Sequence, residues 1–342
     1  MGWPRLNAHH CRRATSAVIA AAVLLLPVTA GAGAVTGTSA QVAAAVAASA
    51  KVTTVNAIVL GELTSPMSLR TSAGYPVVKQ DCLTVTACVF GDLNSSRTMV
   101  LYGDSHAMMW LPAVVPYATH NHLRLVLLWL GACPIIALPG AYTMIGYNGS
   151  AGPTSESACA TFRTSAMQAI SSLHPYLVMV AERTANVVMG ASATGRNLFP
   201  SSIWSRNLSV TLASLHAASP RVVLVEDIPY VGRSPGNCLS RHLKSVQGCV
   251  VPCPNTNLNA AGASLLGQQS AERAAARTTS TGFIPTTQWF CPTAGPGVEP
   301  IINDIVTYYD ESHVSAPYAA WLSGVMGGSI TRVLLPRSEN RS

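Results

Sequence analysis

Five short, continuous apolar runs constrain the fold of this 342-residue chain more than any other feature. They are rich in Val, Leu, Ile or Tyr, and they are TMVLY (98–102), RLVLLW (124–129), YLVMVA (176–181), RVVLVED (221–227) and IVTYY (305–309). A strand with one face in water alternates apolar and polar residues, whereas a continuous apolar run suits a strand that is buried on both faces. We therefore expect these runs to form a buried parallel sheet.

Helical segments separate these runs. The clearest are HAMMWLPAVVPYATHN (106–121), ATFRTSAMQAISSLH (160–174) and NLSVTLASLHAAS (207–219). Alternation of strands and helices is typical of a parallel sheet with helices on both sides. The sequence therefore predicts the α/β class, and a chain of this length is long enough to bury one large core.

The N-terminal segment has the pattern of an export signal. Arg5, Arg12 and Arg13 precede the apolar stretch AVIAAAVLLLPVTAGAGA (17–34), which ends in small residues. A proline and glycines interrupt this stretch, and its apolar part is shorter than the ~20 residues that a membrane span needs. We expect residues 1–32 to be a cleaved signal peptide, and an uncleaved membrane anchor is the alternative.

Composition divides the rest of the chain. Residues 33–80 begin with an Ala/Ser/Thr/Val-rich stretch of almost no charge, so we expect a low-complexity spacer and lead-in. Residues 81–336 contain the apolar runs and form the expected domain, and residues 337–342 are a tail. The net charge is +7, but the basic residues are scattered, and we infer no nucleic-acid partner from them.

The cysteine count agrees with export. The chain has nine cysteines, of which one, Cys11, lies in the expected signal peptide. The other eight are Cys82, Cys88, Cys133, Cys159, Cys238, Cys249, Cys253 and Cys291. An even number in an exported chain indicates disulfides. A zinc site made by the last four is the alternative, but their spacing lacks paired C-x-x-C knuckles, and no metal is expected.

Spacing suggests which cysteines pair. Two bridges are expected: Cys82 and Cys88 enclose only five residues, and Cys133 and Cys159 bracket the loop after the second apolar run. The last four leave two arrangements open, in which Cys238 pairs with Cys249 or with Cys253 and the remaining cysteine pairs with Cys291.

The first apolar run ends in the tetrapeptide Gly-Asp-Ser-His. Gly103 allows the backbone to turn sharply, and Ser105 follows at the start of a helix, where free N–H groups stabilise negative charge. Ligands of open parallel sheets bind at the carboxyl ends of strands. Ser105 is therefore a candidate nucleophile. The alternative is that Asp104 is a helix cap and His106 a satisfied surface residue.

A second motif, TYYDESHVSAPYAAWL, follows the last apolar run. Asp310 and His313 are three residues apart, so the carboxylate can hold one imidazole nitrogen and stabilise the protonated ring. The other nitrogen is then free to take a proton from Ser105. If Asp310 and Ser312 are merely caps, His313 is incidental. Two such motifs at one sheet edge favour a Ser105–His313–Asp310 catalytic triad.

These two motifs resemble the first and last blocks of the SGNH/GDSL hydrolase superfamily. More narrowly, the chain from about Cys82 to Leu322 resembles the SGNH domain found fused to bacterial acyltransferase-3 membrane proteins, with CVFGDLNSSRTMVLYGDSHA, ACP, VEDIP and DESHVS as the similar stretches. The resemblance implies a three-layer α/β/α, flavodoxin-like fold with a central parallel sheet. It also implies that Ser105 is the nucleophile, with His313 and Asp310 as its partners.

The same resemblance implies an oxyanion hole, to which superfamily members usually contribute a Gly and an Asn. Gly131, after the second apolar run, and Asn186, after the third, are the candidates. A clear G-x-N-D block is missing from the sequence, so Arg183 is an alternative to Asn186. All of these could equally be plain loop residues.

The expected function is that of an exported serine-dependent O-acyltransferase or acyl esterase of cell-envelope glycans, without a metal or organic cofactor. Because the fused proteins carry a membrane module, we expect this chain to act as a free domain or with a separate membrane acyltransferase. The segment 229–300, which includes Tyr230 and Trp289, is the expected acceptor surface. The alternatives are a non-catalytic glycan-binding or structural module with a vestigial triad, and a metal-dependent envelope enzyme that uses the cysteines.

Overall fold

The structure of the protein is a computed structural model. The residues that it describes are 36–65, 69–70, 81–138, 142–144, 155–184, 187–189, 200–253, 260–293 and 297–335. They belong to one compact unit, Val35–Ser342. The expected signal peptide and the expected tail lie outside the described residues.

A six-stranded sheet with the strand order β1-β3-β2-β5-β7-β8 forms the centre of the fold. Its strands are β1 (Val89–Gly91), β2 (Thr98–Gly103), β3 (Arg124–Trp129), β5 (Leu177–Ala181), β7 (Val222–Val225) and β8 (Gly282–Ile284). The strands β3, β2, β5, β7 and β8 are parallel to one another, and β1 runs antiparallel to β3 at the edge. The first four apolar runs are confirmed as neighbouring strands, and the expected central parallel sheet is confirmed with them.

The fifth apolar run is not a strand of this sheet, so that prediction was wrong. Only β10 (Ile305–Val306) is extended there, and it pairs with β9 (Ile301–Ile302) in a separate two-stranded sheet. Val306 and Tyr308 are fully buried, Val306 in a small cluster apart from the sheet and Tyr308 in the core on one face of the sheet. Their burial in irregular backbone produces the same apolar run that a central strand would. The missing fifth parallel strand is β8, whose three residues leave little pattern in the sequence.

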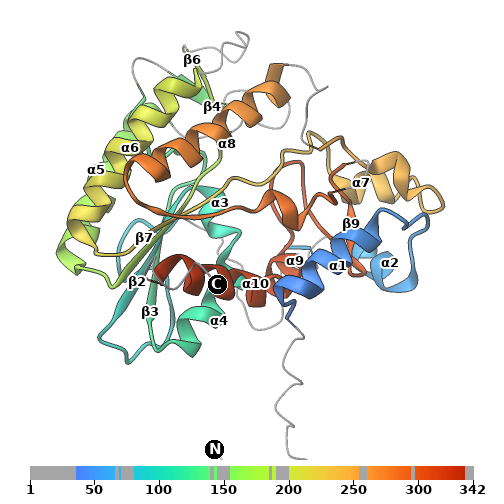
Figure 1. Cartoon of the computed structure of the whole chain (residues 1–342), viewed down its shortest axis with the longest axis horizontal. Helices are drawn as coiled ribbons and strands as arrows, with labels where there is room; N and C mark the ends of the chain where they lie inside the picture. Colours follow the sequence, from blue (N-terminus) through green and yellow to red (C-terminus); the bar gives the residue numbers. More distant parts are fainter. Residues whose placement is uncertain are drawn as a thin grey trace, which may run out of the picture. The chain divides into compact units, whose positions relative to one another are not determined.

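Helices cover both faces of the sheet (Figure 1). The helices are α1 (Ser39–Ser49), α2 (Ala57–Thr64), α3 (Ser105–Met108), α4 (Leu111–His120), α5 (Glu156–Leu173), α6 (Ser201–Ala218), α7 (Pro235–Leu239), α8 (Ala260–Thr278), α9 (Ala316–Trp321) and α10 (Ser323–Leu334), with 3₁₀ turns η1 (Val246–Cys249) and η2 (Thr287–Trp289). A further small antiparallel pair joins β4 (Tyr142–Met144) to β6 (Val187–Met189).

Two hydrophobic cores result from this layering. Met99 and Leu101 of β2 face the core that α4, α9 and α10 cover, whereas Val100 and Tyr102 face the core that α5, α6 and α8 cover. All four side chains are inaccessible to solvent. Burying a side chain of this size stabilises the fold by about 1.5–3 kcal/mol. The three-layer α/β/α architecture implied by the sequence is therefore confirmed.

The stretch expected to be a spacer is structured from residue 39 to residue 64. Thr38 and Gln41 form a capping box at the start of α1. Val42 and Val46, one helical turn apart, are buried in the same core as the first face of the sheet. This segment therefore forms helices, one of which packs on the domain, which differs from the expected low-complexity spacer.

Four disulfides connect the eight cysteines of the domain. They are Cys82–Cys88, Cys133–Cys159, Cys238–Cys249 and Cys253–Cys291. The first two are the pairs expected from loop positions, and the last two select one of the two arrangements left open. Within the described ranges, no helix has both the length and the apolar character needed to cross a membrane.

Candidate active site

The turn from β2 into α3 presents Ser105. A Cβ atom on Gly103 would lie 1.8 Å from the carbonyl oxygen of Ala181 and 2.8 Å from the side chain of Ala107. Glycine is therefore the residue that lets β2 run this close to β5 before the chain turns. Ser105 follows at the first position of α3 and is half-buried at the carboxyl edge of the sheet.

Asp104 fixes this turn and caps α3. One carboxylate oxygen accepts the backbone N–H of His106 at 2.8 Å, and the other accepts the backbone N–H of Arg183 at 3.0 Å. Asp104 is fully buried, and its burial raises its pKa although the two N–H donors act in the opposite direction. The carboxylate thus ties the serine turn to the loop after β5, as the cap interpretation of Asp104 requires.

Ser105, His313 and Asp310 form a continuous chain of hydrogen bonds. Nε2 of His313 lies 2.9 Å from Oγ of Ser105, and Nδ1 of His313 lies 2.8 Å from Oδ2 of Asp310. Oδ1 of Asp310 also accepts the backbone N–H groups of Ser312 and His313, at 2.9 Å and 2.8 Å. Burial alone would raise the pKa of Asp310, but these hydrogen bonds and the charge of His313 lower it to about 2. The three predicted residues therefore lie together in one site.

A loop, and not a strand of the main sheet, carries His313 to this position. Tyr308 and Val314 form an isolated antiparallel bridge, and the backbone N–H of Tyr309 donates to the carbonyl of His313 at 3.2 Å. The Tyr309 ring stacks on the imidazole, with 5.2 Å between ring centres and 12° between planes. The expectation that a terminal strand delivers His313 was wrong, because a short bridged loop holds the ring instead.

A second histidine–carboxylate pair lies next to the first, and the sequence analysis missed it. Nδ1 of His106 lies 2.6 Å from Oδ1 of Asp227, and both side chains are buried. The other oxygen of Asp227 accepts the backbone N–H and the hydroxyl of Thr184, at 2.8 Å and 2.9 Å. His106 is therefore not a surface residue. The usable signal was Asp227 at the end of the fourth apolar run, at the same sheet edge as Ser105.

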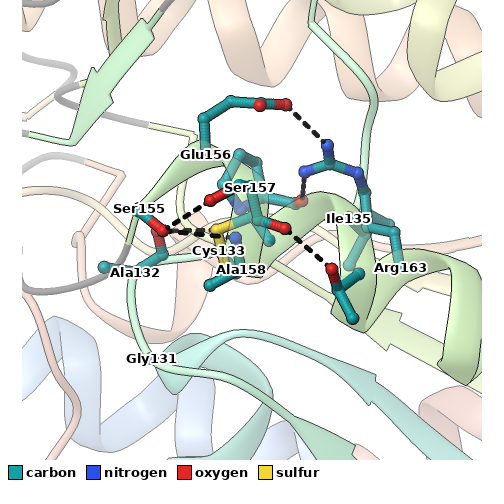
Figure 2. Close-up of a disulfide and its surroundings, with 12 residues drawn as sticks. Gly131, Ala132, Cys133, Ile135, Ser155, Glu156, Ser157, Ala158 and Arg163 are labelled. Carbon is teal, nitrogen blue, oxygen red and sulfur yellow. Dashed lines mark hydrogen bonds and ion pairs between the residues drawn. A yellow bond between two sulfur atoms is a disulfide. The ribbon is translucent and has the colours of Figure 1, made fainter.

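The candidates for the oxyanion hole are placed differently from one another. The backbone N–H of Gly131 donates to Oδ1 of Asp81 at 3.1 Å, in the loop that follows β3. The Cys133–Cys159 disulfide joins this loop to α5 (Figure 2). The backbone of Arg183 contacts Asp104, and its guanidinium lies 5.6 Å from the centre of the Tyr230 ring. Asn186 lies outside the described residues.

Metal-binding clusters are not found among the described residues, because no three His, Cys, Asp or Glu side chains are arranged to hold an ion. The last four cysteines, which were the alternative zinc ligands, are joined in two disulfides. These thiols are consequently not available as metal ligands in this structure.

The largely parallel sheet thus lies between two helical layers, and Ser105 follows the carboxyl end of β2. A family model described as "SGNH domain (fused to AT3 domains)" matches residues 75–327. This range is well over half of the chain, and the chain belongs to that family. No curated protein matches the chain.

Solved structures with a similar fold include the periplasmic domain of a lipopolysaccharide acetyltransferase from Salmonella ser. Paratyphi A. Its TM-score is 0.51 at 16% identity, over 70% of this chain and 86% of that chain. A GDSL-like lipase from Bacteroides thetaiotaomicron has a TM-score of 0.42 at 11% identity, over 70% and 90% of the two chains. An aryl esterase from M. smegmatis has a TM-score of 0.42 at 13% identity, over 70% and 100%. The first of these supports the α/β/α fold.

Proposed function

We propose that the protein is a serine-dependent acyl ester hydrolase or O-acyltransferase. The observation that carries this proposal is the hydrogen-bonded chain from Ser105 through His313 to Asp310. In the proposed reaction, Oγ of Ser105 attacks an ester carbonyl while Nε2 of His313 takes the hydroxyl proton. Asp310 stabilises the imidazolium that forms. His313 then returns the proton to the leaving alcohol, and the acyl group stays on Ser105.

The second half of the proposed reaction regenerates the serine. Water or a sugar hydroxyl donates its proton to His313 and attacks the acyl carbonyl. His313 then returns the proton to Oγ of Ser105 as the bond to the acyl group breaks, which releases either a free acid or an acylated sugar. The negative charge on the carbonyl oxygen needs N–H donors, and the backbone N–H of Ser105 at the start of α3 is the first candidate. Gly131 is the second candidate, and its N–H would have to exchange Asp81 for the oxyanion.

The substrate we propose is an acylated cell-envelope glycan, and the protein would act outside the cytoplasm. The family description and the fold shared with a periplasmic lipopolysaccharide acetyltransferase domain support this choice. Four disulfides suit an oxidising compartment. Export through a signal peptide at 1–32 and cooperation with a separate membrane acyltransferase belong to the same proposal.

Replacing the proposed nucleophile tests the mechanism. We expect Ser105→Ala to lower the turnover of a p-nitrophenyl acetate-type ester by at least about 10³-fold and to abolish the burst of the first turnover, because no acyl-enzyme can form. Ser214→Ala, an exposed serine of α6, is the matched control and should keep full activity. A Ser105→Ala protein with unchanged turnover would exclude the serine mechanism and favour a non-catalytic module.

A further inference from the structure

A buried His106–Asp227 pair lies against the imidazole of the proposed triad. The ring centres of His106 and His313 are 5.0 Å apart, and the planes meet edge to face at 62°. The side chain of His106 is 3% exposed and that of Asp227 is 1% exposed. Two imidazole–carboxylate pairs therefore lie side by side. His106 of α3 and Asp227 of the loop after β7 form one pair, and His313 and Asp310 of the loop before α9 form the other.

The hydrogen bonds decide the charge of this pair. Nε2 of His106 is inaccessible to solvent and has no hydrogen-bond partner among the described residues. A protonated ring would bury that N–H without an acceptor, which costs free energy. His106 is therefore neutral, with its proton on Nδ1 and directed to Asp227. Asp227 accepts this hydrogen bond and two more from the backbone N–H and the hydroxyl of Thr184. Three hydrogen-bond donors favour the ionised carboxylate.

Three other buried carboxyl groups near the pair have raised pKa values. Burial raises the pKa of Glu182 and of Glu272 well above the usual range. Oε2 of Glu272 accepts the backbone N–H of Asp227 at 3.2 Å. Burial also raises the pKa of Asp104. Among these four carboxyl groups, Asp227 is the one whose pKa is lowered: burial would raise it, but the hydrogen bonds from His106 and Thr184 lower it.

We propose that the Asp227–His106 pair is a second carboxylate–imidazole unit that places a negative charge behind His313 and stabilises its protonated form during the reaction. This inference rests on the proposed role of His313 as the base. His106 and Asp227 are positioning residues, since they act through His313 and not on the substrate. Their contribution adds to that of Asp310, which holds Nδ1 of the same ring.

Other titratable and charged groups also face His313 from the neighbouring elements, and each of them could influence the pH dependence of the reaction. The loop of His313 itself contributes Asp310, Glu311, Ser312 and the stacked Tyr309, and α3 contributes Ser105 and His106, with Asp227 behind His106. Arg70 lies over Tyr309, and Arg183 is within electrostatic reach of Glu311. A substitution at Asp227 leaves all the others in place. A change in pH dependence can then be assigned to the charge of the buried pair.

The first test needs no substitution. Nitrogen NMR of ¹⁵N-histidine-labelled full-length protein reports the protonation of each imidazole nitrogen. We expect His106 to be neutral, with its proton on Nδ1, at every pH at which the protein is active. A cationic His106 in that range would overturn the inference, because the pair would then carry no net charge.

The second test compares Asp227→Asn with Asp92→Asn. Asp92 also lies against a histidine, since its Oδ2 is 3.1 Å from Nδ1 of His122, but that pair is exposed. We expect Asp227→Asn to lower kcat/KM about tenfold and to move the acid limb of its pH profile down by about one unit, because one pKa unit corresponds to a tenfold change in protonation. Asp92→Asn should change neither quantity.

A folded Asp227→Asn protein whose acid limb does not move would reduce the pair to a structural role and overturn the inference. If circular dichroism shows that this variant is unfolded, the NMR result on the unsubstituted protein decides. Ser105→Ala separates the two proposals, because activity that survives that substitution removes the triad itself.

Discussion

At the residue scale, the low pKa of Asp310 excludes this carboxyl group as the one that controls activity at mildly acidic pH. The pKa of Asp310 is about 2, below its ordinary value of 3.8, because hydrogen bonds and the charge of His313 outweigh its burial. A depressed pKa means that the carboxylate stays ionised above about pH 3 and that its stabilising effect is lost only as the pH falls toward 2. Any loss of activity at higher pH must therefore come from another group.

We predict that a single protonation lowers kcat/KM as the pH falls from 8 to 4, because a protonated His313 can no longer accept the hydroxyl proton of Ser105. Asp310→Asn should lower the rate at every pH in this range, because the imidazolium loses its counter-charge. Initial rates with a soluble ester across this range check both statements. A rate that is flat down to pH 4 would contradict a histidine base.

Gly103 allows the closest backbone approach at the active-site edge. We predict that Gly103→Ala destabilises the fold by about 1–3 kcal/mol and disturbs Ser105, because its Cβ would overlap the carbonyl of Ala181. Gly328→Ala, within α10, is the matched control, since nothing lies within 4 Å of the added atom. It should stabilise the protein by up to about 1 kcal/mol. Urea unfolding of both variants measures the difference, and equal midpoints would refute the steric argument.

At the scale of elements, loop length separates the disulfides. Cys133–Cys159 closes a loop with a sequence separation of 26, whereas Cys82–Cys88 closes one of 6. We predict that replacing both cysteines by serine costs about 3.5 kcal/mol for the first bridge and about 2 kcal/mol for the second, since a longer loop restricts the unfolded chain more. Denaturant unfolding of the two double variants tests the order. A larger loss for the shorter loop would contradict this account.

The same scale shows what sequence patterns could predict. Continuous apolar runs identified β2, β3, β5 and β7, because strands buried on both faces leave an unbroken signal. They failed at residues 305–309, where Val306 and Tyr308 are buried without pairing in the central sheet, and at β8, which has three residues. Spacing placed Asp310 beside His313. The contact of His106 with Asp227 joins residues 121 positions apart, and no local pattern records it.

At the scale of the whole molecule, the sequence suggested an acceptor surface over residues 229–300. The structure restricts that suggestion, because Trp289 is 3% exposed and packs edge to face on Trp110 in the core. Arg233 also donates to the carbonyls of Gly248 and Val250 within the same region. Tyr230 is half-buried beside Arg183, and the backbone N–H of the next residue, Val231, donates to the carbonyl of Glu311 in the loop that carries His313.

The last prediction concerns where the acyl group goes. Hydrolysis and transfer share the acylation of Ser105 and differ in what reaches the acyl-enzyme. Water is present at about 55 M, so a transferase must hold its acceptor hydroxyl in place and gain effective molarity. We predict transfer to envelope oligosaccharides, with slow hydrolysis when none is present. An activated ester supplied with and without these sugars, followed by mass spectrometry, tests it.

Tyr230 supplies the matched comparison for this experiment, because an aromatic face beside the site suits a sugar ring and takes no part in the proposed proton transfers. Tyr230→Ala should lower the yield of acylated sugar while hydrolysis of the activated ester alone continues, since the triad is intact. Equal loss of both reactions would show that the substitution damages the site and not acceptor binding. Acid release at the same rate with every added glycan would identify a plain esterase, because an acceptor that binds near Ser105 must compete with water for the acyl group.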